Sequence, residues 1–256
     1  MRCSICNYKF MKKNKIFLII YDNVKTLLGA LFLAILIRSL FFQPFYIPSS
    51  SMEPTLLVGD RIFVSKYTYG YSKHSFPFSP NFSNKRFFSK QPERGDLVVF
   101  KTPADNRTDY IKRLIGLPDD SIQFINGDLY INEQKIKREP TIINEKIRCG
   151  SFLLETNNFI ETLPNGVTHF VSYKKRGSLQ NTQKFKVPKG HFFLLGDNRD
   201  CSKDSRYLDS VGYVKKLNLV GEAKLIFFSN DTNISSLLKF WNLGDSFRFS
   251  RLFYKL

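Results

Sequence analysis

Three short segments of the chain carry the polar side chains best suited to chemistry, and the first is a serine-rich loop. Between Ile47 and Leu56, three consecutive serines lie between Pro48 and Pro54. Because proline fixes its own φ and restricts the residue before it, this loop should be rigid. A nucleophile in a rigid loop has little orientational entropy left to lose. The same composition also suits an ordinary linker.

The second segment, Asp109 to Gly116, places Lys112 inside an apolar run that is typical of a strand. Alternation puts Tyr110, Lys112 and Leu114 on one face. Burial against apolar side chains disfavours a charged amine, so the pKa of Lys112 would fall and the amine could act as a general base near neutral pH. The alternative is a solvent-facing lysine on an edge strand.

The third segment, Gly196 to Arg206, is dense in Asp, Asn, Ser and Arg and follows an apolar strand. The spacing is not that of an EF-hand loop, and Arg199 and Arg206 would oppose a cation. We therefore expect a hydrogen-bonded Asp–Arg network that supports a nearby site. A metal site is the alternative, because four side chains supply oxygen donors: Asp197, Asn198, Asp200 and Asp204.

The histidines are not placed to activate a serine. His74 and His169 lie in the least regular stretches, and His191 follows a turn ahead of an apolar strand. None is part of a G-x-S-x-G or H-E-x-x-H pattern. The sequence therefore predicts structural or solvated histidines, and a lysine or carboxylate would have to take the proton from a serine nucleophile.

An N-terminal apolar segment precedes all three segments. Residues 24–42 can span a bilayer if Lys25 and Arg38 reach toward opposite interfaces. Bulky residues and a proline follow, which argues against a cleaved secretory signal; a buried core helix is the other alternative. Lysines are concentrated in residues 1–23, so we predict a cytoplasmic N-terminal segment and an uncleaved anchor.

Beyond residue 42, short apolar runs alternate with turn signals, and Asn126-Gly127 is a strong hairpin signal. The sequence predicts a mainly β protein, with an N-terminal transmembrane helix followed by an antiparallel β catalytic domain at 43–131 and 185–256. Residues 132–184 are predicted to be a peripheral β subdomain or insertion, and 71–92 a loop. The predicted strands are 45–47, 61–64, 97–100, 110–115, 122–125, 129–131, 185–187, 192–195 and 219–228.

The formal net charge of +17 favours an anionic partner, either nucleic acid or phospholipid headgroups. A solvated basic surface would give the same balance, and no zinc-finger, RNP-like or basic-zipper pattern accompanies the charge. Cys3 and Cys6 form a lone C-x-x-C without the partners of a zinc site. Cys149 and Cys201 could pair only if the fold brings them together.

Together, the three segments resemble the bacterial type I signal peptidases, a family of Ser–Lys proteases. The resemblance rests on RSLFFQPFYIPSSSMEPTLLVGDRIFVSKYTYG, on RGDLVVFKTP followed by DYIKRLIGLPDD, and on GDNRDCSKDSRY. The order of these stretches and their position after an N-terminal anchor also match. Three departures remove no group that the mechanism needs: Ser50 and Asp119 replace common glycines, and Cys201 replaces a common asparagine.

The resemblance implies that Ser51 is the nucleophile and Lys112 is its general base. The backbone N–H of Ser51 and the hydroxyl of Ser49 would form the oxyanion hole, donating to charge that develops in the transition state. The family's supporting residues for the lysine, a serine that orients the amine and an ion pair, align with Ser202, Asp204 and Arg206.

The resemblance also implies the substrate and the compartment. Shallow apolar subsites would accept alanine and similar small side chains at the first and third positions before the cut. The partners would be preprotein signal peptides and membrane phospholipid, with no nucleic acid, metal ion or organic cofactor. The protein would be a single-pass protein of the bacterial inner membrane with its catalytic domain on the periplasmic side. The residues that align with the subsites are Phe45, Ile47, Met52, Leu56, Ile62, Val99, Tyr110 and Ile111.

Two other functions compete with this interpretation. Another Ser–Lys protease, such as a self-cleaving repressor, would carry a DNA-binding helix pair, and the membrane anchor argues against it. A non-enzymatic, membrane-tethered protein that binds nucleic acid or lipid through its +17 charge would leave the coincidence of the three segments unexplained.

Overall fold

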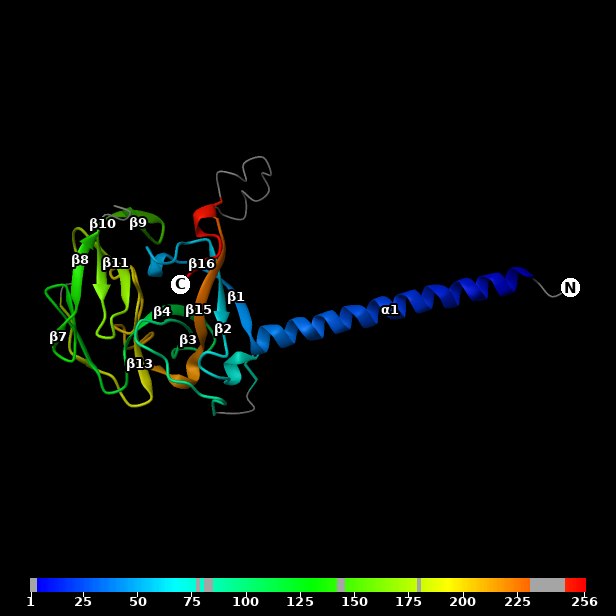
Figure 1. Ribbon diagram of the computed structural model, residues 1–256, viewed down its shortest axis with the longest axis horizontal. Helices are drawn as coiled ribbons and strands as arrows, with labels where there is room; N and C mark the ends of the chain where they lie inside the picture. The colour runs from blue at the N-terminus through cyan, green and yellow to red at the C-terminus, as the bar shows by residue number, and fades with distance from the viewer. Residues whose placement is uncertain (1–3, 77–78, 81–84, 142–145, 179–180, 231–246) are drawn as a thin grey trace.

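A long helix is attached to one side of a β domain (Figure 1). The structure, a computed structural model, describes residues 4–76, 79–80, 85–141, 146–178, 181–230 and 247–256. Helix α1 (Ser4–Leu40) projects away from the strands, and the N-terminus lies at its far end. Within α1, the stretch Phe17–Leu40 is long and apolar enough to cross a membrane.

The bounds of this stretch differ from the predicted span at 24–42. The polar residues Tyr21 to Asn23 do not interrupt α1, because a helix continues through isolated polar side chains as long as its backbone hydrogen bonds are intact. The helix ends at Leu40, shortly before Pro44, which favours an extended residue ahead of it. Phe42 therefore starts a strand instead of ending the span.

The main sheet has eight strands among the described residues, in the order β1-β2-β15-β3-β4-β13-β14, with β16 beside β15. Neighbouring strands in this sheet are antiparallel. Its strands are β1 (Phe42–Tyr46), β2 (Asp60–Ser65), β3 (Leu97–Lys101), β4 (Asp109–Gly116), β13 (His191–Leu195), β14 (Val214–Lys215), β15 (Leu219–Ser229) and β16 (Tyr254–Lys255).

Strand β3 lies in the interior of the domain, with both faces covered. Leu97 and Val99 belong to one buried apolar cluster, whereas Val98 and Phe100 belong to another on the opposite face. Double-sided burial explains why this strand is apolar at successive positions instead of at alternate ones. Lys112 of β4 lies directly opposite Val98 in the antiparallel register, so its strand runs through the same interior.

The peripheral part of the protein is built from two further sheets, and the predicted mainly antiparallel β fold is confirmed. Strands β8, β10 and β11 form one sheet with β9 paired to β10, and the other has the order β12-β5-β6-β7. The predicted Asn126-Gly127 hairpin joins β5 to β6. The strands are β5 (Ser121–Ile125), β6 (Asp128–Ile131), β7 (Gln134–Lys135), β8 (Lys137–Thr141), β9 (Lys146–Cys149), β10 (Phe152–Thr162), β11 (Thr168–Lys174) and β12 (Phe185–Lys186).

The sequence assigned β5, β6 and β12 to the catalytic domain, whereas they pair with β7 in a separate sheet. Their apolar side chains nevertheless share one buried cluster with Phe193 and Leu195 of β13, so the peripheral sheets pack directly on the main sheet. Between Tyr71 and Phe87, which form an isolated bridge, the described residues contain only a short 3₁₀ helix, η2 (Lys73–Ser75). This agrees with a loop at 71–92, of which residues 77–78 and 81–84 lie outside the described residues.

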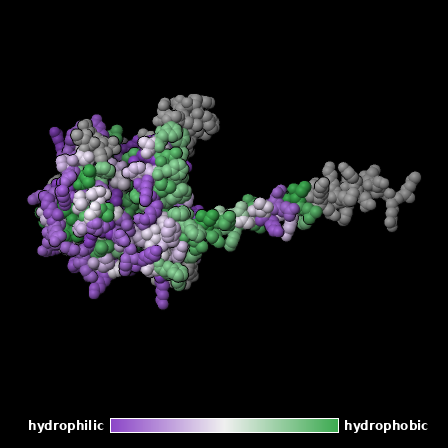
Figure 2. Space-filling model, in the orientation of Figure 1, coloured by the Kyte–Doolittle hydropathy of each residue, from purple (hydrophilic) through white to green (hydrophobic). Residues whose placement is uncertain are grey.

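The β domain has an apolar side next to the base of α1 and a more polar side around the peripheral strands (Figure 2). Apolar side chains cover the edge of the domain from which the helix emerges. A large exposed apolar surface is uncommon on a protein that contacts only water, and it is typical of a protein–protein or membrane contact. Exposed aromatic residues at the helix base and in the C-terminal segment are Phe41, Phe42, Phe249, Phe253 and Tyr254.

Candidate active site

A cavity of about 410 Å³ lies between β1 and the first half of β4. The curl of the main sheet brings these two strands together, although three strands separate them in the pairing order. Among the described residues, 109–112 of β4 pair with β3 on one side only, because β13 pairs with the other end of the strand. One wall of the cavity therefore offers unpaired strand backbone to an extended ligand.

Ser51 and Lys112 meet at this cavity, although 61 residues separate them in the chain. The Lys112 amine donates a hydrogen bond to the Ser51 hydroxyl at 2.6 Å. A second bond runs from the amine to the carbonyl of Ile111 at 2.9 Å. Ser51 belongs to a short 3₁₀ helix, η1 (Ser50–Met52), and is 8% exposed. The two groups are therefore close enough for direct proton transfer.

Burial controls the charge of Lys112, whose residue is only 3% exposed. Loss of water lowers the pKa of the amine to about 8. The carboxylates of Asp204 and Asp197 oppose this shift, while the Arg206 guanidinium adds to it. The amine lies 5.5 Å from the centre of the Tyr110 ring, which helps to shield it from solvent. A sizeable neutral fraction is therefore present near neutral pH.

The hydroxyl of Ser49 lies 3.4 Å from that of Ser51. Ser49 has an extended backbone and directly precedes η1, so its side chain reaches the same edge of the cavity. The structure thus brings Ser49, Ser51 and Lys112 to one place, as the sequence predicted.

Ser202 is buried beneath the serine loop, but its hydroxyl makes no hydrogen bond with the Lys112 amine. Its orienting role for the amine stays a prediction. Gly196 permits this packing: a Cβ there would lie 2.2 Å from the Ser202 hydroxyl and 2.5 Å from the Ser51 carbonyl oxygen. Only glycine lets the two loops approach so closely, a requirement that the sequence analysis missed.

Asp204 and Arg206 form the predicted ion pair. Nε of Arg206 lies 2.8 Å from one carboxylate oxygen of Asp204, and a terminal nitrogen lies 2.8 Å from the other. Asp204 also accepts the backbone N–H of Gly196 at 3.0 Å. Burial alone would raise the pKa of Asp204, but the Arg206 charge and these hydrogen bonds lower it. Asp204 therefore stays a carboxylate, and its charge acts on the Lys112 amine.

A second buried ion pair, between Arg113 and Asp197, also supports the site, and sequence reasoning missed it. Arg113 donates to both carboxylate oxygens of Asp197, at 2.9 and 2.7 Å, and Thr55 donates to Asp197 at 2.6 Å. Arg113 also donates to the carbonyl of Gly95 at 2.8 Å. Arg113, the residue after Lys112, thus connects strand β4 to both the GDNRD loop (residues 196–206) and the serine loop (residues 47–56). The sequence did contain a signal for a functional role of Arg113, because this residue directly follows Lys112 in an otherwise apolar run.

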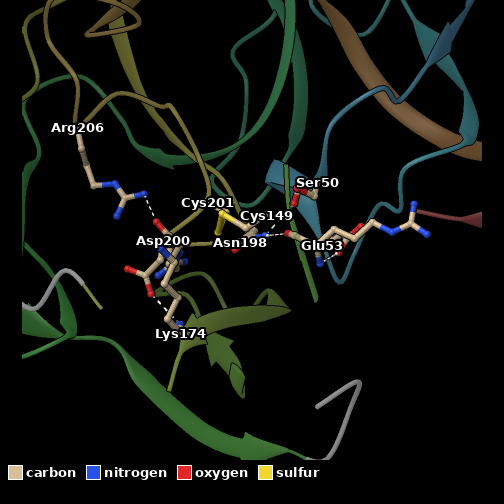
Figure 3. The surroundings of a disulfide bond; sticks show 10 residues. Ser50, Glu53, Cys149, Lys174, Asn198, Asp200, Cys201 and Arg206 are labelled. Atoms are coloured by element: carbon tan, nitrogen blue, oxygen red, sulfur yellow. Dashed lines mark hydrogen bonds between the residues drawn. A yellow bond between two sulfur atoms is a disulfide. The ribbon is translucent and has the colours of Figure 1, made fainter. Parts of the chain in front are cut away.

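Cys149 of β9 and Cys201 of the GDNRD loop form a disulfide (Figure 3), which settles a question that the sequence left open. Asn198 lies beside it and donates from its amide nitrogen to the carbonyls of Ser50 and Arg148, both at 3.0 Å. The backbone N–H of Arg148 in turn donates to Glu53 at 2.8 Å. The end of β9 therefore connects the serine loop (residues 47–56) to the loop that carries Asn198 and Cys201.

Six of the eight predicted substrate-binding residues line the cavity. Met52 and Leu56 do not: both are completely buried in the core cluster beneath it. Their side chains point inward because η1 and the following turn pack on the main sheet. The six lining residues are Phe45, Ile47, Ile62, Val99, Tyr110 and Ile111. Lining residues that the sequence analysis did not assign to the substrate site are Tyr46, Pro48, Thr108, Asp109, Cys201 and Lys203.

The histidines lie outside the cavity. His169 is buried, with Nε2 3.6 Å from Glu161, and its pKa falls well below the usual value because it loses water. His74 is buried and hydrogen-bonded to Ser79 at 3.0 Å. His74 and His169 therefore have structural environments, in agreement with the prediction.

Comparison with known proteins places the chain in a family. The profile of the family described as "Signal peptidase, peptidase S26" matches residues 20–228. A signal peptidase I of Rickettsia typhi is 43% identical over 88% of this chain and 89% of its own, and one of Rickettsia bellii (strain OSU 85-389) is 39% identical over 91% and 84%. The crystal structure of a signal peptidase I from Enterococcus faecalis V583 is 28% identical, covers 52% of this chain and 97% of its own, and gives a TM-score of 0.32. The chain therefore belongs to the signal peptidase family of S26 serine endopeptidases.

Proposed function

We propose that this protein removes signal peptides from preproteins by cutting after Ala-x-Ala-like sites, and that Ser51 and Lys112 form its catalytic dyad. The observation that carries the proposal is the 2.6 Å contact between the buried Lys112 amine and the Ser51 hydroxyl at the edge of an apolar cavity. Membership of the signal peptidase family supports the class of substrate.

In the first step, neutral Lys112 takes the proton of the Ser51 hydroxyl as the oxygen attacks the scissile carbonyl. The ammonium ion then gives this proton to the leaving amine, and an acyl-enzyme forms on Ser51. In the second step, Lys112 takes a proton from water, whose oxygen attacks the ester, and returns it to the Ser51 oxygen. Asp204 and Asp197 favour the transient ammonium form, because both carboxylates raise the pKa of the amine.

The backbone N–H of Ser51 and the hydroxyl of Ser49 are the proposed donors to the oxyanion. Preorganised donors aimed at developing negative charge contribute more in a water-poor site than in bulk water. The 3.4 Å distance between the Ser49 and Ser51 hydroxyls supports this proposal, because a carbonyl attacked by the Ser51 oxygen would lie next to the Ser49 hydroxyl. Ser202 is proposed to orient the lysine amine once a substrate closes the cavity.

The substrate would bind as an extended strand against residues 109–112 of β4, whose open edge supplies backbone hydrogen bonds. Its side chains would alternate toward the cavity, whose apolar walls include Ile62, Val99 and Ile111. A small side chain fits at the first and third positions before the cut, whereas a larger one meets buried core residues that cannot move apart.

The β domain is proposed to lie on the periplasmic face of the inner membrane, with the N-terminus in the cytoplasm. The apolar edge around the helix base would rest on the bilayer (Figure 2), and the net charge of +17 would favour anionic lipid. The Cys149–Cys201 disulfide supports this side, because disulfides persist in the periplasm and are rare in the cytosol.

Cleavage of a purified preprotein tests the function. The full chain, in detergent, is expected to cut directly after the second alanine of an Ala-x-Ala site, as read from the N-terminal sequence of the product. Changing that alanine to leucine should slow cleavage by at least about tenfold, because the added isopropyl group has no space. Leucine at the intervening position of the site serves as the control and should have little effect on the cleavage rate. Equal cleavage rates for the original preprotein and both altered preproteins would contradict the proposed subsites.

The pH dependence of the same reaction reports on Lys112. Its pKa is lowered to about 8, and only the neutral amine accepts a proton. We therefore expect kcat/KM to rise with pH up to about 8 and then to level off, and to fall about tenfold per pH unit well below that value. A substrate without titratable groups near the cut removes the substrate's own contribution. A profile that is flat down to about pH 6 would mean that another group is the base.

A further inference from the structure

A second cavity, of about 480 Å³, lies where the membrane-spanning helix joins the β domain. Arg38, in the last turn of α1, forms one of its walls. Lys66, Lys101 and Arg107 come to it from the loops and strand ends of the β domain. Asp109 is the single carboxylate among the lining residues. Four basic side chains and one carboxylate thus line this cavity, which we call the basic cavity.

The positive charge of this basic cavity is largely uncompensated. Asp109 is already paired with Lys101, whose amine lies 2.9 Å from the carboxylate. Lys101 also donates to the Arg107 carbonyl at 2.7 Å. Across the part of the chain that the structure describes, neither the Arg38 nor the Arg107 guanidinium forms an ion pair with a carboxylate. Both retain donors that can reach an anion.

Lys66 is the most unusual member of the group, because it is only 2% exposed. Its amine donates to the carbonyl of Ser75, which uses one of its three N–H donors. Burial, together with the charges of Arg38 and Lys101, lowers the pKa of Lys66 to about 8, although Asp109 opposes the shift. A buried ammonium surrounded by other cations lacks a counter-charge, which an anion in the cavity would supply.

The position of the basic cavity restricts the anion that it can meet. Arg38 lies at the end of the stretch Phe17–Leu40, which places the cavity at the level of the lipid headgroups. Exposed Phe41 and Phe42 lie next to it in the chain, as expected for residues at a bilayer interface. The cavity also shares Phe45 and Asp109 with the active-site cavity. A ligand here would therefore touch the wall of the substrate site.

We propose that the basic cavity binds the phosphate group of an anionic phospholipid. Two guanidinium and two ammonium groups provide more donors than a phosphate has oxygens, and guanidinium pairs well with phosphate in a bidentate manner. The acyl chains would extend along α1 toward the bilayer. The binding site itself depends only on membrane anchoring, whereas any effect of the lipid on cleavage rests on the proposed function.

Binding is measured with the full chain in a neutral detergent, titrated with short-chain phosphatidylglycerol and followed by calorimetry. We expect saturable binding at one site, with much weaker binding of phosphatidylcholine of the same chain length. Arg107→Gln and Arg38→Gln should each weaken phosphatidylglycerol binding by about tenfold. Arg176→Gln is the matched control, because Arg176 is exposed on the peripheral part of the protein and lies outside the cavity. Both arginines in the cavity are exposed, so these variants should fold. Lys66→Met removes the buried ammonium group and should also weaken phosphatidylglycerol binding.

Three results would overturn the proposal. One is the absence of saturable binding. Another is an equal loss in Arg176→Gln, which would indicate general attraction to a basic protein. The third is inorganic phosphate that binds as tightly as phosphatidylglycerol, which would identify free phosphate as the ligand. Ser51→Ala should bind the lipid like the wild type, so this result stays informative even if the proposed peptidase mechanism fails.

Discussion

Replacing Ser51 with alanine, or Lys112 with methionine, is expected to reduce preprotein cleavage by at least about 10⁴-fold, to background. The first change removes the attacking oxygen, and the second removes the amine that accepts its proton from 2.6 Å away. Methionine fills most of the space of the lysine stem and leaves no buried charge, so the Lys112→Met protein should fold. Because the two groups act as a unit, the double variant should be no less active than either single variant.

Ser50→Ala is the matched control for this prediction. Ser50 is a buried neighbour in the same 3₁₀ helix, and it contributes its backbone carbonyl, not its hydroxyl, to the bond with Asn198. Its alanine variant should therefore retain most of the activity. Initial cleavage rates at equal amounts of folded protein, checked by circular dichroism, give the comparison. Turnover by Ser51→Ala or Lys112→Met above background would remove the dyad from the mechanism.

Most strands were predictable because their sequence signals are local. Alternating or continuous apolar runs between turn residues indicated every strand that the sequence analysis named, and the double burial of β3 explains its LVVF run. The curl of the main sheet and the separate pairing of β5, β6 and β12 were not predictable. Pairing partners depend on contacts between distant segments, which a periodic pattern does not specify.

The site was predictable only to the extent that whole motifs indicated it. Nothing local in Lys112 or Ser51 predicts a contact across 61 residues, and the resemblance supplied that pairing. Met52 was assigned to the substrate site because it aligns with a subsite residue of the family, yet the turn of η1 directs it into the core. Asp119 adopts a left-handed φ of 70°, a conformation that favours the glycine it replaces. Sequence type alone cannot tell whether a substituted residue keeps the backbone conformation.

Replacing Arg199 with methionine is expected to lower the free energy of unfolding by about 3 to 5 kcal/mol. The side chains of Arg199 and Glu161 are 0% and 1% exposed, and the guanidinium donates to both carboxylate oxygens. Arg199 also donates to the hydroxyl of Tyr173 at 2.8 Å and to the carbonyl of Gly196 at 3.2 Å. Without the guanidinium, Glu161 is a buried carboxylate without its principal partner. Urea unfolding of the full chain in detergent, followed by near-ultraviolet circular dichroism, measures the loss.

A double variant separates the ion pair from the packing of its side chains. Adding Glu161→Met to Arg199→Met removes the unpaired carboxylate. Most of the lost stability should then return, because apolar groups of similar size can replace a buried ion pair at little net cost in free energy. Glu161 lies on β10 and Arg199 lies in the loop that carries Asp204, so the pair also fixes the peripheral sheet against that loop. The double variant should therefore recover its stability more completely than its cleavage rate. If the double variant is as unstable as Arg199→Met, packing or the bonds to Tyr173 and Gly196, instead of the unpaired charge, would explain the effect.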